Sequence, residues 1–425
     1  MIVLAILLLI VLALYGAPLF AVIAAGAMIG FFSSGIDLSV MATELYRLAE
    51  MPVLVAIPLF TFAGYLLGEG GAPRRLVRLT DAMIGWLPAG LAVVALVACA
   101  LFTAFTGASG VTIVALGALL VPALRHAGYR ENFNLGLITT SGSLGLLFAP
   151  SIPLILYGII AQQQAAGRGV TITDMFLAGI LPGLLMLVLL VAWAVWENRF
   201  RDSARIPFNW SELRGALRES AWEIPLPVVV LGGIYSGYFA ISEAAAVTAL
   251  YVLLVEILVH REIGFKRLPA VMRESMVMVG GILIILGMAL ALTNFLIDAQ
   301  VPTAIFQFIR HHVHEQITFL ILLNIFLLIL GALLDIFSAL VLVVPLILPV
   351  AVGYGINPVH LGIIFLANMQ IGYFTPPVGM NLFIASFRFE TPVAQIYRAT
   401  LPFFFILLFA VLIITYWPAL SLALL

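Results

Sequence analysis

The stretch Ile371-Gly372-Tyr373-Phe374-Thr375-Pro376-Pro377-Val378-Gly379-Met380-Asn381 decides how this chain folds. It lies in an apolar segment, but its two consecutive prolines lack backbone N–H groups and therefore interrupt the hydrogen bonds of a helix. An earlier stretch, Thr139 to Pro153, contains two prolines and is interrupted in the same way. Both breaks leave carbonyl groups that need a polar partner, and Thr375 adds a hydroxyl. For Thr139 to Pro153 the alternative is a proline kink without a function.

The composition places these broken helices in a membrane. Of the 425 residues, 64% are apolar and 9% are charged, against roughly 45–50% and about 25% in soluble domains. Apolar runs long enough to cross about 30 Å of hydrocarbon recur throughout the chain. They include Met1 to Phe32, Met175 to Trp196, Ser275 to Ile297 and Leu401 to Leu422. We therefore predict an all-α polytopic membrane protein whose first span, about 2–32, is retained and not cleaved as a signal peptide.

The basic residues predict how the chain is oriented. Sixteen of the 19 Lys and Arg residues fall in loops on one side, and only Arg47, Arg168 and Arg310 fall on the other. Because basic loops stay in the cytoplasm, we expect a bacterial inner-membrane protein with a cytoplasmic N-terminus and a periplasmic C-terminus. The net charge of −1 gives no reason to expect binding to nucleic acid. The single cysteine, Cys99, excludes an internal disulfide, and we interpret it as a small buried residue.

A repeat relates the two halves of the chain. An ungapped offset of 227 residues superposes Pro122 on Pro349, and Pro150 on Pro377. The predicted parts are a first inverted-topology repeat, 1–197, with a re-entrant helical hairpin at about 91–122 and a broken helix at about 132–159; a basic cytoplasmic linker plus one connecting span, 198–240; and a second repeat, 241–425, with its hairpin at about 317–353 and its broken helix at about 361–386. Helices lying flat in the interface are expected within 70–88 and 301–316. Such antiparallel repeats with broken helices are typical of transporters with a binding site near the midplane.

The hairpin tips are the other candidate polar sites. The first, Phe105 to Thr112, is rich in glycine and small hydroxyl residues, which permit unwinding and cation binding but also close helix packing. The second, Gly331 to Ser338, contains Asp335, an ionisable group at membrane depth. Such a group usually pairs with a cation, a proton or a polar network. The alternative for Asp335 is a carboxylate that accepts hydrogen bonds from backbone amides and so holds the hairpin.

Other functions find little support. The chain contains no Gly-x-x-x-x-Gly-Lys-Ser/Thr loop, so it should not hydrolyse ATP. An enzyme would need a nucleophile or a metal cluster at the midplane, and no His–acid or Ser–Lys pair lies in the predicted spans. His311, His312 and His314 have no neighbours suited to a metal and are interpreted as surface residues, whereas Asn324, Asn368 and Gln370 are candidates to line a pathway.

Two groups of motifs resemble the large membrane subunit of tripartite ATP-independent periplasmic (TRAP) transporters. The first group is Gly107-Ala108-Ser109-Gly110 with Ala149-Pro150-Ser151-Ile152-Pro153. The second is Gly331 with Asp335, Gly355-Ile356-Asn357-Pro358 and Thr375-Pro376-Pro377-Val378-Gly379-Met380-Asn381. The resemblance runs over nearly the whole chain. It implies an elevator-type, Na⁺-coupled transporter that takes up a small organic acid, with a small four-helix membrane subunit and a periplasmic binding protein as partners, within membrane lipids.

The resemblance also implies about two Na⁺ ions as coupling ions and no organic cofactor. One ion is expected among Ser109, Gly145, Phe148 and Pro150, and the other among Gly331, Gly372, Thr375 and Val378. The candidate substrate residues are Ala108, Gly110, Ser141, Asp335, Ser338 and Asn381. A carrier that works alone, coupled to Na⁺ or H⁺ and without a binding protein, remains the alternative. The carried acid cannot be named, because no Lys or Arg lies within a predicted span to select it.

Overall fold

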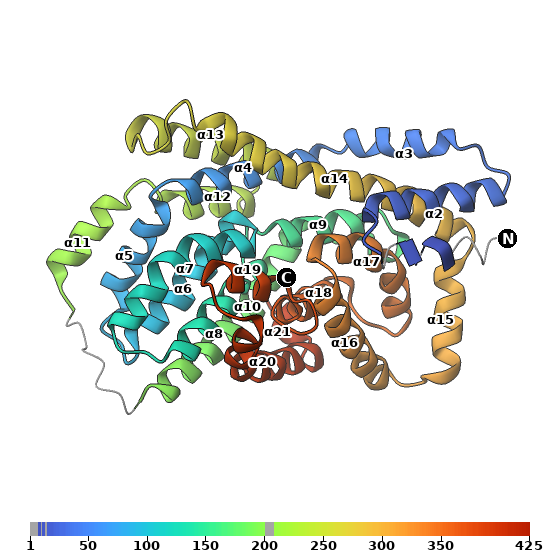
Figure 1. Ribbon diagram of the computed structural model, residues 1–425. Helices are drawn as coiled ribbons and strands as arrows, with labels where there is room; N and C mark the ends of the chain where they lie inside the picture. The colour runs from blue at the N-terminus through green and yellow to red at the C-terminus, as the bar shows by residue number, and fades with distance from the viewer. Residues whose placement is uncertain (1–6, 10, 13–14, 200–207) are drawn as a thin grey trace.

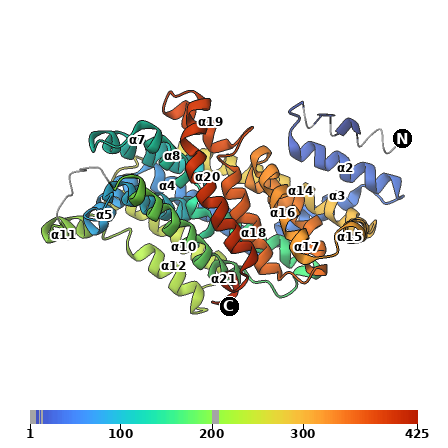
Figure 2. The same ribbon diagram turned by 90° about the horizontal axis from the view of Figure 1, so that it is seen from below.

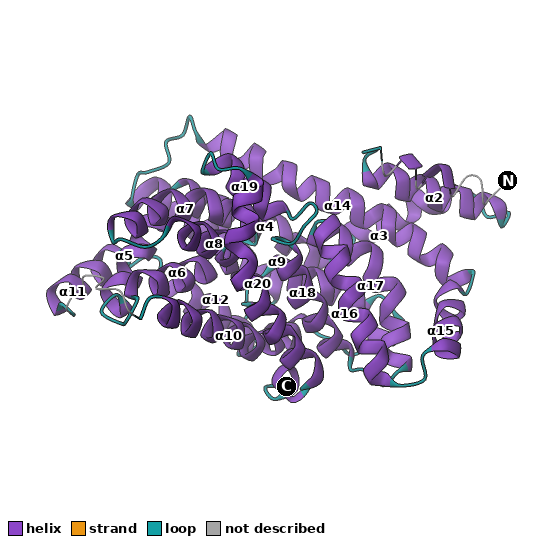
Figure 3. Cartoon of the chain, turned by 60° about the horizontal axis from the view of Figure 1, so that its bottom comes forward, coloured by secondary structure: helices purple, strands orange, loops and turns teal. Residues whose placement is uncertain are grey.

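The computed structural model describes residues 7–9, 11, 12, 15–199 and 208–425. Helices, turns and loops account for all of the described residues, as Figure 3 shows. Eight of the helices are long and apolar enough to cross a membrane, and a ninth span is possible if the bent pair Glu131–Leu147 and Ile152–Gln162 is counted as one. The prediction of an all-helical, polytopic membrane protein is therefore confirmed.

The helices follow one another along the chain as α2 (Leu19–Ser33), α3 (Ser39–Ala49), α4 (Ala56–Glu69), α5 (Ala72–Ile84), α6 (Gly90–Thr106), α7 (Ser109–His126), α8 (Glu131–Ser141), α9 (Ile152–Gln162), α10 (Ile172–Glu197), α11 (Trp210–Glu219), α12 (Pro225–Tyr235), α13 (Ile241–Leu254), α14 (Leu268–Asp298), α15 (Val301–His312), α16 (Gln316–Leu333), α17 (Ile336–Gly353), α18 (Pro358–Gly372), α19 (Met380–Arg388), α20 (Val393–Tyr416) and α21 (Ala419–Leu422). A short π-helix, Val255–Val259, extends α13.

The bounds of several helices differ by the offset seen in the sequence. α6 ends at Thr106 and α16 at Leu333, which are 227 residues apart. The same separation relates both ends of α7 to those of α17, and the start of α8 to the start of α18. Each half thus has an amphipathic helix (α5 or α15), then a hairpin, an interrupted helix and a long apolar helix, in that order.

The interrupted helices form the core. Every residue from Val359 to Gly372 in α18 is buried, and so is every residue from Phe133 to Ser141 in α8. A helix that is apolar on all sides has to be surrounded by other elements. The halves supply these neighbours to each other, because α8 packs against α20, α9 against α17, and α10 against α18. The two halves therefore share one core and do not fold as separate domains.

The long helices α4, α13 and α14 lie along one side of this core, together with α3 (Figure 1). α14 packs against α2, α3 and α4, while α4 also packs against α13. The two amphipathic helices lie far apart: α5 is at one end of the molecule and α15 at the other (Figures 1 and 2).

Two predicted spans differ from the structure. Residues 1–6, 10, 13 and 14 lie outside the described residues, but Tyr15 to Pro18 form a turn before α2, so one uninterrupted helix over 2–32 is wrong. The connecting span expected at about 224–240 is also too long. Its helix, α12, has 11 residues, or about 17 Å at 1.5 Å per residue, less than the ~30 Å of hydrocarbon. Residues 200–207 of the predicted linker are outside the described residues.

A buried charge cluster fixes α5 to the end of α13. Arg75 is only 2% exposed, and its guanidinium contacts Glu223 at 2.6 Å, Glu262 at 2.8 Å and Glu256 at 3.1 Å. The Gly71 amide also donates to Glu262. Burial alone would raise the pKa of Glu262, but the hydrogen bonds from Arg75 and Gly71 outweigh it and hold that pKa below its usual range. Three segments distant in sequence are thereby joined at the junction between α4 and α5.

Candidate functional site

The first hairpin turns in two residues. α6 ends at Thr106, Gly107 has a φ of +64°, Ala108 is extended, and α7 begins at Ser109. This non-helical part is shorter than the 105–112 expected. Thr106 explains part of the difference, because its hydroxyl donates to the Phe102 carbonyl and keeps the last turn of α6 helical. The turn itself suits glycine, which adopts a positive φ without steric cost.

Threonines fasten this tip to the first broken helix. Thr103 Oγ1 lies 2.7 Å from Thr112 Oγ1 across the hairpin, and it donates to the Gly142 carbonyl at 2.9 Å. A Cβ on Gly145 would come within 2.3 Å of the Ala100 carbonyl oxygen, so the backbone of the break lies directly against α6. Only glycine permits this close approach, so packing against α6 requires a glycine at position 145.

The first break lies between α8 and α9 and contains the short 3-10 helix Leu144–Leu147; the segments Glu131–Leu147 and Ile152–Gln162 meet at 41°. Pro150 cannot donate to the carbonyl of Leu146, and the hydroxyl of Ser151 replaces that hydrogen bond at 2.6 Å. The Phe148 amide donates to the Gly145 carbonyl at 3.0 Å. A carbonyl oxygen has two lone pairs, so each of these acceptors keeps capacity for a cation.

The second hairpin tip shows what Asp335 does. Its Oδ1 accepts hydrogen bonds from the amides of Phe337 and Ser338, both at 3.0 Å, and its Oδ2 accepts the hydroxyl of Ser338. Asp335 is therefore the N-cap of α17, a position that aspartate favours because it satisfies the first free amides of a helix. The structure adopts the alternative that the sequence left open, in which this carboxylate holds the hairpin.

The second break, residues 373–379, lies against this second tip. The amides of Val378 and Gly379 both donate to the Ala332 carbonyl at 3.2 Å. A Cβ on Gly372 would stand only 2.4 Å from the carbonyl carbon of Gly331, so the backbones of the two glycines touch. The Thr375 hydroxyl donates to the Ile371 carbonyl at 2.8 Å. The break and the tip are thus joined mainly through backbone contacts.

Asn381 joins the two halves. Its Oδ1 accepts the hydroxyl of Ser109 at 2.8 Å, and its Nδ2 donates to the Thr139 carbonyl at 3.2 Å. A second link runs from the Ser143 hydroxyl to the Gln370 carbonyl at 3.3 Å. Ser143 and Gln370 are themselves 227 residues apart, so corresponding points of the two halves meet here. The two breaks are therefore held next to each other in the core.

The structure brings the predicted ligands of one ion together more completely than those of the other. Gly331, Gly372, Thr375 and Val378 come together at the second tip through the contacts given above. In the first group, Gly145 and Phe148 share a hydrogen bond and Pro150 follows them. No hydrogen bond between described residues joins Ser109 to those three, but its backbone oxygen is close to Gly142, where a Cβ would lie 3.3 Å from it.

The predicted substrate residues are separated into two places. Ala108 and Gly110 lie at the first tip and are partly exposed, and Asn381 is linked to that tip through Ser109. Ser141 is fully buried and donates to the Ile138 carbonyl. Asp335 and Ser338 lie at the second tip and bond to each other. No hydrogen bond between described residues links them to Ala108, Gly110 or Ser141.

The donor set fits a hard monovalent cation. In the described part of the chain no three His, Cys, Asp or Glu side chains gather as a metal-binding group. Ligands at these breaks would therefore be carbonyl and hydroxyl oxygens, which are the ligands that hard cations prefer. The neutral oxygens also impose no net charge on the site.

Sequence reasoning missed Thr103, which acts through its hydroxyl group and leaves no pattern in a sequence. Thr139 and Ala332 lie in the stretches singled out, but their roles as carbonyl acceptors could not be predicted. Gln370, a predicted pathway residue, is fully buried, and both polar atoms of its side chain lack a hydrogen-bond partner among the described residues. The shared offset between Ser143 and Gln370 is the one signal that could have paired these two residues.

Comparisons with known proteins give the family. The family model described as "Tripartite ATP-independent periplasmic transporter, DctM component" matches residues 4–420. The C4-dicarboxylate TRAP transporter large permease protein DctM of Pseudomonas aeruginosa is 35% identical over 385 residues, covering 90% of this chain and 88% of that protein. The ectoine/5-hydroxyectoine TRAP transporter large permease protein UehC of Ruegeria pomeroyi is 32% identical over 417 residues, covering 97% and 96%.

A solved structure supports the fold alone. The YdaH transporter of Alcanivorax borkumensis, described as having an unusual topology, superposes with a TM-score of 0.64 at 15% sequence identity. The match covers 89% of this chain and 87% of that one. The relatives are named as transporter permeases, in agreement with the prediction that the chain is not an enzyme. The chain belongs to the DctM family, the large multi-pass membrane component of bacterial tripartite ATP-independent periplasmic transporters.

Proposed function

We propose that the chain couples an inward Na⁺ gradient to the uptake of a small organic acid, which a periplasmic binding protein delivers and a small membrane subunit helps to admit. The observation that carries the proposal is the contact of each backbone break with the hairpin of its own half. The first break lies against α6 at Gly145, and the second lies against Gly331 at Gly372. Cation binding at such a contact would draw the tip and the break together.

Carbonyl and hydroxyl oxygens support two Na⁺ positions. At the first break the Phe148 amide donates to the Gly145 carbonyl, and Ser109 lies on the neighbouring hairpin tip. At the second, Gly331, Gly372, Thr375 and Val378 lie on touching backbone segments. Because a bound Na⁺ must exchange its water for protein oxygens, both parts of each contact need to be in place at the same time. Closing of a hairpin would then depend on the ion.

The first tip is the better position for the carboxylate of the substrate. Both α7 and α17 begin at a hairpin tip, and the N-terminus of a helix attracts anions. Asp335 already occupies the amides at the start of α17, and its negative charge would repel a second carboxylate. The start of α7, at Ala108, Ser109 and Gly110, has no acidic side chain in its first turn. We therefore place the acid against α7, next to Asn381.

Movement by an elevator mechanism agrees with the arrangement of the helices. The hairpins and broken helices share one core, whereas α2, α3, α4, α13 and α14 pack along its side. The amphipathic helices α5 and α15 connect these two parts at opposite ends of the molecule (Figures 1 and 2). In this proposal the core moves as one body, and α5 and α15 lie in the two interfaces of the membrane.

Uptake into proteoliposomes tests the proposal. The chain is reconstituted with its small subunit and binding protein, and labelled acids of the classes named for its relatives are offered: C4-dicarboxylates, ectoines and isethionate. We expect uptake of at least one of them only with an inward Na⁺ gradient. Equal uptake when K⁺ replaces Na⁺ would refute the coupling. Full uptake without the binding protein would instead favour the stand-alone carrier.

A further inference from the structure

The buried cluster around Arg75 contains more carboxyl groups than cations. Three glutamates contact the one guanidinium: Glu223, Glu256 and Glu262. His260 Nε2 lies 3.3 Å from Glu223 and adds a second positive charge only when its ring is protonated. Arg75 and a charged His260 would together balance two carboxylates. At least one of the three carboxyl groups is therefore left without a cation.

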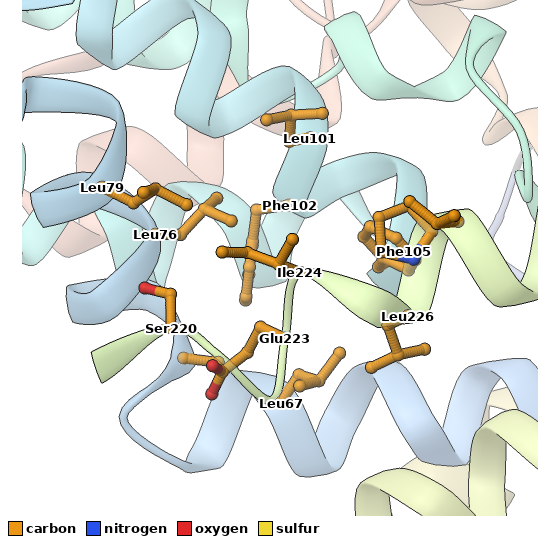
Figure 4. Close-up of a pocket in the computed structure, with 13 residues that line it drawn as sticks. Leu67, Leu76, Leu79, Leu101, Phe102, Phe105, Ser220, Glu223, Ile224 and Leu226 are labelled. Carbon is orange, nitrogen blue, oxygen red and sulfur yellow. The ribbon is translucent and has the colours of Figure 1, made fainter. Parts of the chain in front are cut away.

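The surroundings of this cluster are apolar, so a surplus negative charge is costly there. Glu223 enters the cluster from the segment between α11 and α12, beside a cavity of about 280 Å³ between α5, α6 and α12 (Figure 4). The residues that line this cavity are apolar apart from Ser220 and Glu223. The side chain of Arg75 is only 2% exposed, and that of Glu256 is fully buried. A carboxyl group in such surroundings has to be paired as an anion or to bind a proton.

Glu256 is the carboxyl group that is least well supported as an anion. Glu262 accepts hydrogen bonds from Arg75 with both oxygens, and a further one from the Gly71 amide. Glu223 accepts one from Arg75 at 2.6 Å and has His260 beside it. Glu256 accepts one from Arg75 at 3.1 Å through its Oε1, and no donor among the described residues reaches its buried Oε2. The side chain of Glu256 is also the most buried of the three, 0% exposed against 12% and 28%.

A proton on Glu256 has an acceptor next to it. Glu256 contacts Nη2 of Arg75 and Glu262 contacts Nη1, and the two carboxyl groups are close enough for a hydrogen bond between them. Two glycines permit this arrangement. A Cβ on Gly70 would lie 2.3 Å from Glu256 Oε2, and one on Gly71 would lie 2.4 Å from Glu262 Oε1. Since two carboxylates at one site repel each other, a shared proton replaces this repulsion by a hydrogen bond.

The other groups near the cluster do not replace this proton. Glu69 and Arg267, at the end of α4 and the start of α14, pair with each other at 2.7 Å. Tyr251 on α13 faces Glu223, and its hydroxyl donates to the Trp222 carbonyl. No three His, Cys, Asp or Glu side chains of the described chain form a metal-binding group, and the guanidinium already lies between the glutamates. A proton adds positive charge without a further set of oxygen ligands.

We propose that Glu256 binds a proton and donates it in a hydrogen bond to Glu262, and that this proton completes the junction of α4, α5 and α13. Glu262 is partly exposed, so the proton can exchange with water at this side of the cluster. Loss of the proton would add a negative charge to the buried cluster and weaken the attachment of α5. The position of α5 would thereby depend on pH. This site does not depend on Na⁺ coupling or on the transported acid.

Glutamine variants of the purified transporter complex test the proposal, because glutamine is a neutral group with the shape of a protonated glutamate. At pH 7, Glu256→Gln should unfold at the temperature of wild type or above it. Glu262→Gln should unfold at a lower temperature, since it removes an anion that pairs with Arg75. Glu212→Gln, at an exposed pair with Arg78, is the control and should change the unfolding temperature little. If Glu256→Gln is destabilised as much as Glu262→Gln, Glu256 is an anion and the proposal fails.

Two further measurements report the proton itself. An unfolded chain releases its glutamate protons above about pH 4.3, whereas the folded protein in this proposal keeps the one on Glu256. The folded state then binds more protons, so wild type should lose stability relative to Glu256→Gln as the pH rises from about 5 to about 7. Infrared spectroscopy at pH 7 should show the C=O stretch of one protonated carboxyl group in wild type that Glu256→Gln lacks. Identical carboxyl bands in the two proteins, or no such loss of stability, overturn the proposal.

Discussion

The contact between Gly331 and Gly372 offers the sharpest test of the second ion site. Gly372→Ala adds one methyl group where the structure has no room. The new Cβ would lie 2.4 Å from the carbonyl carbon of Gly331, and ordinary contact begins at 3.4 Å. The second tip and the break must therefore separate by about 1 Å, since the obstacle is backbone and cannot turn aside.

The size of the effect follows from this displacement. Binding groups have to be held within about 0.5 Å of their working positions, so a shift of about 1 Å removes at least one oxygen ligand from the ion. We expect the Na⁺ concentration for half-maximal uptake to rise at least tenfold, which corresponds to about 1.4 kcal/mol. Overpacking should cost a further 1–3 kcal/mol, roughly, in the stability of the fold. Uptake into proteoliposomes and thermal unfolding in detergent measure the two quantities.

Gly280→Ala is the matched control. Gly280 lies in α14, where an added Cβ would meet nothing within 4 Å, and alanine favours a helix more than glycine does. This variant should transport as wild type does and unfold at the same or a slightly higher temperature. A folded Gly372→Ala protein with the Na⁺ dependence of wild type would show that the two glycines do not form part of an ion site.

Three further changes test individual side chains. Thr375→Val keeps the shape of the side chain but removes the hydroxyl. It should raise the Na⁺ concentration for half-maximal uptake about tenfold, or about 1.4 kcal/mol. If that concentration is unchanged, Thr375 is not part of the site. Asp335→Ala should lower the free energy of unfolding by about 1 kcal/mol, whereas Asp335→Asn should not, because asparagine caps a helix as well as aspartate does. If both variants lose transport equally, the charge of Asp335 matters and not its role as a cap. Arg75→Gln leaves three carboxyl groups without their partner and should cost roughly 3–5 kcal/mol in thermal unfolding. Arg78 is exposed and pairs with Glu212 and Glu219, so Arg78→Gln should cost only about 0–1 kcal/mol. Equal losses would contradict the role given to the buried cluster.

Local chemistry explains why the breaks could be predicted. Proline removes an amide donor wherever it stands, so Pro150 and Pro377 interrupt their helices regardless of tertiary contacts. The apolar composition required helices, and the offset of 227 residues located the second set of bounds from the first. These features depend on residue types and their positions along the chain, which is the information that a single sequence provides.

The parts that were missed depend on distant residues. The interpretation of Asp335 remained open because a carboxylate at a hairpin tip can cap a helix or bind a cation, and only the positions of Phe337 and Ser338 decide between them. Arg75 was counted among the cytoplasmic basic residues, since nothing in the sequence relates it to Glu223 and Glu256. The first span failed because hydropathy measures composition and does not register a turn at Tyr15 to Pro18.

Equilibrium binding of radiolabelled Na⁺ to the purified chain tests most directly whether the two backbone breaks hold ions. The account predicts about two Na⁺ per wild-type chain, displaced by unlabelled Na⁺ but not by equal K⁺, and about one per chain in Gly372→Ala at the same concentration. Two results would contradict it. One is that folded Gly372→Ala retains both ions. The other is that an equal concentration of K⁺ displaces all of the labelled Na⁺ from the wild type.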